Sequence, residues 1–139
     1  MNRFGTDLFR FDLPGEDWVE STIQMYTPKG SDASVFMITR SDRVGEPGDL
    51  LDTALKNFPK SPDLELELVR SGPNKVGLLE AWDTGFVKRT QLSAEYIRFL
   101  SVGYYDRELH FCWAGPAAER VVIDERAERS KDTVRFRSR

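Results

Sequence analysis

The chain has 139 residues, of which 40% are hydrophobic and 31% are charged, and its formal net charge at pH 7 is −3. This composition is typical of one folded domain and excludes a disordered chain, and the acidic balance argues against a dedicated nucleic-acid binder. Cys112 is the only cysteine, which excludes an intrachain disulfide. We therefore expect a single domain over residues 1–139.

No window of the sequence approaches the ~20 apolar residues that a membrane-spanning helix needs. The first residues lack the apolar stretch of a signal peptide, and a lone cysteine fits a reducing compartment. We therefore expect a cytoplasmic protein that neither inserts directly into a membrane nor binds nucleic acid.

The first part of the chain alternates with the period of two that is typical of strands. We predict three strands, at residues 8–13, 18–26 and 33–40. The period then changes, because apolar residues within 50–58 fall at helical spacing after Asp49, which we expect to be the N-cap. Pro59 predicts the end of this helix.

Strand-like alternation returns after the helix, and we predict four more strands, at residues 64–68, 76–83, 91–102 and 108–113. After Pro116 the pattern becomes helical, with a thin apolar stripe of Ile123, Ala127, Ser130 and Val134. The order β-β-β-α-β-β-β-β-α predicts an α+β fold. Its expected architecture is an antiparallel, roughly seven-stranded curved sheet with two helices mainly on one face.

Some predicted strands are apolar on both faces, which a sheet with one solvated face does not need. In the third strand Val35 and Met37 lie on one side and Phe36 and Ile38 on the other, and the second strand has a similar pattern. Either another element covers the second face, or that face binds a partner. Methionines such as Met25 fill core gaps, but they also suit surfaces that accept varied apolar partners.

The sequence contains no glycine-rich phosphate loop, no G-x-S-x-G elbow and no paired C-x-x-C. The best remaining catalytic candidate is His110 with Cys112, which alternate onto the same face of a predicted strand. We favour the alternative of a buried cysteine beside a partly buried histidine. Carboxylates at Asp42, Glu46 and Asp49 lie in a turn, where solvation and capping explain them better than catalysis. We therefore expect no enzyme, no cofactor and no metal.

Two segments, 9–26 and 34–40, resemble a known family. In the first, the resemblance is carried by Phe11, Leu13, Pro14 and Trp18, and in the second by the run from Ser34 to Arg40. Together with the order of the elements, they resemble the Eag chaperones of bacterial type VI secretion, within the DcrB- and PsbP-like superfamily. The helix that Pro59 ends is shorter than is usual in that family. Two methionines also stand where smaller branched residues are common.

The resemblance implies a PsbP/DcrB-like fold and a cytoplasmic homodimer. It also implies a function, which is to hold the hydrophobic N-terminal segment of a secreted effector, of the Rhs or PAAR type, before export. By strand position it implies client-binding residues at Ile23, Met25, Val35, Met37 and Thr39. The alternative that stays open is a DcrB/PsbP-like scaffold or regulatory module that binds a folded protein surface.

Overall fold

A computed structural model describes residues 3–5, 10–12, 23–26, 34–59 and 61–136 of the chain. Its elements in these ranges are β1 (Arg3–Gly5), β2 (Arg10–Asp12), β3 (Ile23–Tyr26), β4 (Val35–Asp42), α1 (Asp49–Lys56), β5 (Leu64–Val76), β6 (Leu79–Thr90), β7 (Ala94–Tyr104), β8 (Arg107–Pro116), a 3₁₀ turn (Ala117–Glu119) and α2 (Arg120–Lys131). The α+β class is therefore confirmed.

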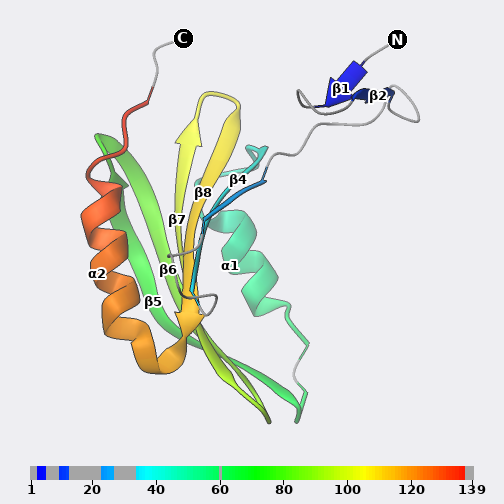
Figure 1. Ribbon diagram of the computed structural model, residues 1–139, viewed down its shortest axis with the longest axis vertical. Coiled ribbons are helices and arrows are strands. Elements are labelled where there is room, and N and C mark those ends of the chain that lie inside the picture. Colours follow the sequence, from blue (N-terminus) through cyan, green and yellow to red (C-terminus); the bar gives the residue numbers. More distant parts are fainter. Residues whose placement is uncertain (1–2, 6–9, 13–22, 27–33, 60, 137–139) are drawn as a thin grey trace.

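The main sheet has six strands in the order β3-β4-β8-β7-β6-β5, and every neighbouring pair is antiparallel. Strands β5 to β8 follow one another as a meander, in which tight turns join consecutive neighbours. Strand β4 then pairs with β8, and β3 forms the far edge. The chain crosses from β4 to β5 through α1 (Figure 1).

The sheet has one strand fewer than we predicted. Of the first predicted strand, the described part is β2, which pairs with β1 in a separate two-stranded sheet. Strand β5 is longer than predicted, because it continues through Pro73 to Val76. An edge strand tolerates proline, whose missing N–H then costs no bond within the sheet. A bulge between Leu68 and Arg70 interrupts the same strand.

The two helices lie on opposite sides of the main sheet (Figure 1), whereas we expected both mainly on one face. Helix α2 buries Ile123 and Ala127 against one face. Helix α1 lies on the other, where Leu55 borders a cavity with Leu66 and Phe86. The physical reason is the two-sided apolarity of the strands, since each apolar face needs cover.

The apolar core lies between α2 and the sheet. Its buried members are Val76, Ala81, Val87, Tyr96, Leu100, Val102, Phe111, Trp113, Ile123 and Ala127. Cross-strand pairing of Leu100 with Phe111 continues the core across β7 and β8. The thin stripe predicted for α2 is thus correct at Ile123 and Ala127, which are both buried.

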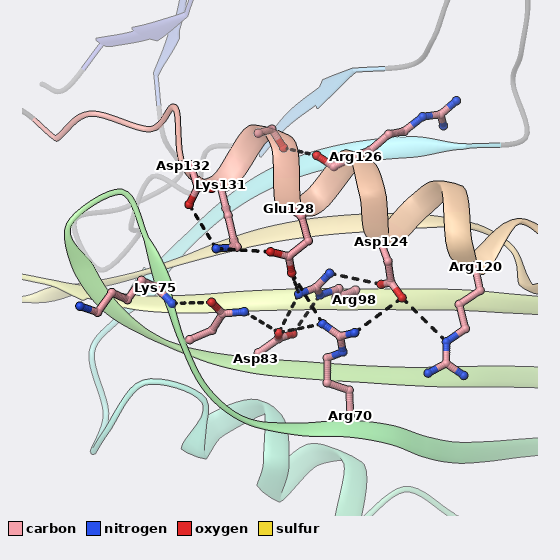
Figure 2. Close-up of polar contacts among 12 residues, drawn as sticks. Arg70, Lys75, Asp83, Arg98, Arg120, Asp124, Arg126, Glu128, Lys131 and Asp132 are labelled. Atoms are coloured by element: carbon pink, nitrogen blue, oxygen red, sulfur yellow. Dashed lines mark hydrogen bonds and ion pairs between the residues drawn. The ribbon is translucent and has the colours of Figure 1, made fainter.

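A buried ionic network supplements this narrow apolar contact (Figure 2). The guanidinium of Arg98 is fully buried and donates two hydrogen bonds to Asp83, of 3.0 Å from Nε and 2.8 Å from Nη2. It also donates to Asp124 at 3.2 Å and to Glu128 at 2.8 Å, both on α2. Arg70 contributes a second cation, 3.2 Å from the Asp83 carboxylate. Asp124 and Glu128 are four residues apart, so α2 presents an acidic stripe beside its apolar one.

We predict that Arg98→Met lowers the free energy of unfolding by about 3–5 kcal/mol, because it leaves the buried carboxylate of Asp83 without its main partner. Urea unfolding followed by circular dichroism measures the effect. Arg89→Met is the matched control, since Arg89 pairs with Glu67 at an exposed site and should contribute at most about 1 kcal/mol. Equal losses in the two variants would contradict the central role of Arg98.

The same network predicts a loss of stability in acid. Burial alone would raise the pKa of Asp83, but hydrogen bonds from Arg98 and Asn74 and the charges of Arg98 and Arg70 hold the pKa below its usual 3.8. The pKa of Glu128 is likewise lowered, since the bond from Arg98 and the charges of Arg98 and Lys131 outweigh burial.

Because the unfolded chain binds these protons more readily, the contribution is present above the ordinary carboxyl pKa and is lost as pH falls through the lower folded values. The free energy of unfolding should therefore fall below about pH 4–5. Glu128→Gln should fall less steeply over the same range in urea titrations. A variant with the full wild-type slope would contradict the assignment.

Candidate functional site

The strand register places the sequence-predicted client-binding positions side by side. Met25 of β3 pairs with Met37 of β4, and Ile23 pairs with Thr39. On its other side β4 pairs with β8, where Val35 and Met37 are opposite Ala114 and Cys112. The paired positions Val35, Met37 and Thr39 alternate onto the face that is opposite α2. The side chain of Ile23 lies outside the described part of the chain.

The same face continues onto β7 with two apolar side chains that we did not predict as site residues. Phe99 pairs with Cys112, and Ile97 pairs with Ala114. We call Met25, Val35, Met37, Ile97 and Phe99 the apolar strip. A signal for its β7 part was present, because Ile97 and Phe99 alternate with Tyr96, Arg98 and Leu100, so that this strand too is bulky on both sides.

The apolar strip is only partly covered. The side chain of Met25 is 61% exposed, and Val35, Met37, Ile97 and Phe99 are partly buried. Small side chains lie between its two halves, since Cys112 and Ala114 on β8 are both buried. The strip can therefore offer flexible and aromatic apolar surface above a small-residue floor.

A polar cluster adjoins the strip on the same face. His110 is central, with Nε2 3.1 Å from the Ser41 hydroxyl and Nδ1 3.1 Å from the Ser101 hydroxyl. Glu108 lies beside it, with Oε2 3.2 Å from Nε2 of His110. Burial lowers the pKa of His110, and burial together with the Asp49 charge raises the pKa of Glu108. Ser101 and Glu108 are almost fully buried, so the cluster offers no open site for a substrate.

Cys112 and His110 share this face, as predicted, but their surroundings do not form a nucleophile–base dyad. The ring nitrogens of His110 contact Ser41 and Ser101 instead. Cys112 is 1% exposed, and burial, with the nearby Glu95 charge, raises the pKa of its thiol to about 12. The thiolate that such a dyad needs is therefore strongly disfavoured.

Two of the turn carboxylates, Asp42 and Asp49, have structural partners. Asp42 pairs with Arg107, and the side chain of Asp49 accepts a hydrogen bond of 3.0 Å from the backbone N–H of Glu46. Asp49 is not the N-cap that we expected, because Gly48 occupies that position with a left-handed backbone. Within the described ranges, no three His, Cys, Asp or Glu side chains gather as a metal site would require, and no helix is long and apolar enough to cross a bilayer.

Solved structures with a similar fold include three that span most of this chain. One is PA94 from Pseudomonas aeruginosa, a protein of unknown function named as a candidate regulator, with a TM-score of 0.69, 14% identity and coverage of 100% of this chain and 99% of that one. Another is LpqN, involved in cell envelope biogenesis of Mycobacterium tuberculosis, with a TM-score of 0.54, 13% identity and coverage of 83% and 82%.

The third is the cyanobacterial PsbP, CyanoP, from Synechocystis sp. PCC 6803, with a TM-score of 0.50, 9% identity and coverage of 91% and 89%. The sequence matches no protein-family model and no curated protein. At these identities the likeness shows the fold, which is PsbP-like as expected.

We predict that Cys112 reacts slowly with iodoacetamide at pH 8 in the folded protein. A rise of the thiol pKa from 9.0 to about 12 lowers the thiolate fraction about 1000-fold, and burial further restricts access. Mass spectrometry of samples with and without urea gives the two rates. Equal labelling of folded and unfolded protein would show that Cys112 is open and reactive after all.

Proposed function

We propose that this chain is a cytoplasmic chaperone or adaptor of type VI secretion, which binds the hydrophobic segment of an effector of the Rhs or PAAR type before export. The observation that carries the proposal is the apolar strip, where Met25 is 61% exposed on the face opposite α2. The resemblance of residues 9–26 and 34–40 to Eag chaperones supports the choice of client.

The physical chemistry of such a complex is favourable. A transmembrane-type helix exposes apolar surface in water, at a cost of about 25 cal/mol per Å². Its backbone polar groups are already satisfied within the helix, so the chaperone needs to supply mainly apolar area. Met25 and Met37 can adapt to clients of different shape, because methionine is flexible and polarisable. The proposed function involves no catalytic turnover. It includes a symmetric dimer of two copies of the chain.

A second candidate function is a regulatory module that binds a folded protein surface. It is favoured by the likeness over the whole chain to PA94, which is named as a candidate regulator. The two functions differ in what they bind. The chaperone should bind an isolated apolar helix, whereas the regulatory module should need a folded partner.

We predict that Met37→Asp and Met25→Asp weaken binding of an apolar helix at least 10-fold, because each buries a carboxylate against apolar surface. The probe is a fluorescent leucine-alanine peptide of about 20 residues with terminal lysines, titrated by anisotropy. Thermal melts should change little for Met25→Asp, since its side chain is 61% exposed in the free protein.

Leu92→Asp is the matched control, because Leu92 is 97% exposed in the turn between β6 and β7. It should bind the peptide as the wild type does, which separates the effect of position from that of added charge. A folded Met25→Asp variant with full affinity would exclude the apolar strip as the binding surface.

A further inference from the structure

Helix α1 is fixed to the sheet tightly at one end. Gly45 and Gly48 precede it with φ of 73° and 92°, in the left-handed region that favours glycine. Gly48 is buried against Trp82, and a Cβ added there would lie 2.3 Å from Cδ1 of the indole. The backbone N–H of Arg43 also bonds the carbonyl of Asp106, at 3.1 Å, in the turn between β7 and β8.

Beyond this end, α1 packs loosely. None of its residues is buried, and Leu50 is 47% exposed. A cavity of about 270 Å³ lies between the helix and β5–β6, lined in part by Leu55, Leu66, Leu68 and Phe86. A second cavity of about 580 Å³ extends from Leu55 to Phe58 and the start of β5. Both spaces are open to solvent on one side, so the apolar groups that line them make fewer contacts than they would in a close-packed interior.

The cavity beneath α1 adjoins the apolar strip. Phe86 lines the cavity, and its ring stacks on Phe99 of the strip with centroids 6.3 Å apart. Phe86 also pairs with Ile97, a second member of the strip. If α1 lifted from β5 and β6, the apolar surface of Leu66, Leu68 and Phe86 would become continuous with the strip.

We propose that α1 is a lid that pivots at Gly45–Gly48 and lifts from β5 and β6 to admit an apolar helical segment. The identity of that segment rests on the proposed function, whereas the motion rests on the packing of α1 itself. Left-handed glycines provide the pivot, the Gly48–Trp82 contact holds the closed position, and the cavities leave the remainder of the helix weakly held.

Gly48→Ala tests the lid, because the new methyl group cannot fit against Trp82 and alanine disfavours the backbone conformation of Gly48. Gly72→Ala is the matched control, since a Cβ at Gly72 meets no atom within 4 Å. The first measurement is native-state hydrogen exchange without any client. In the wild type the amides of α1 should exchange faster than those of β7 and β8. Gly48→Ala should speed exchange in α1 at least 10-fold further and leave β7 and β8 unchanged.

The second measurement is the affinity for the leucine-alanine peptide, which Gly48→Ala should increase several-fold, because a lid that is already open removes the cost of opening. A cross-linked variant gives the opposite test. Leu55→Cys and Leu66→Cys, in a Cys112→Ala background, are joined by a short bifunctional thiol reagent. Cross-linking should slow exchange in α1 and weaken peptide binding at least 10-fold relative to the same variant before cross-linking.

Exchange of α1 at the rate of the sheet would overturn the lid, whatever the peptide does. If neither Gly48→Ala nor the cross-link changes the affinity for the peptide, the role of α1 in admitting a client is overturned. If neither the wild type nor any variant binds the peptide, the proposed function is rejected. Hydrogen exchange would still decide whether α1 is a lid.

Discussion

Arg98 carries a positive charge into a fully buried position, where the carboxylates of Asp83, Asp124 and Glu128 pair with it. Two of these acids, Asp124 and Glu128, belong to α2, so the position of that helix depends on the charge as well as on its apolar side chains. Apolar contact alone allows a helix to slide or rotate, whereas hydrogen bonds from one rigid guanidinium fix it in both respects. The position of α2 on this face also determines which face of the sheet it leaves to other elements.

Because α2 is committed to one face, the helix that covers the opposite face, within the part of the chain that the structure describes, is α1. That helix lies over β5 and β6 and leaves the strip around Met37 and Phe99 partly exposed. The two faces of the sheet therefore differ, because α2 packs tightly on one and α1 packs loosely on the other. One face holds the apolar core, and the other keeps partly exposed apolar side chains, which the proposed function would use.

Sequence periodicity was sufficient to predict the class, the main strands and both helices, because alternation and helical spacing are local properties. It also placed Met25 and Met37 on one face, since register follows from that alternation. The ionic network was not predictable, because Arg98 and Glu128 are 30 residues apart and nothing local marks either as buried. The N-cap was wrongly assigned to Asp49 for a related reason, because Gly48 takes that position through a close contact with Trp82, which is distant in the sequence.

Strand β5 ends the sheet with a bulge after Leu68 and with Pro73 further along. A proline has no N–H to offer to an incoming strand, and a bulge breaks the straight edge that such a strand would need. Growth of the sheet from molecule to molecule is therefore obstructed along this border. Apolar side chains that stay exposed to water favour association through the face of the sheet. Because the β5 edge is obstructed, such association does not extend into a polymer of paired strands along that edge.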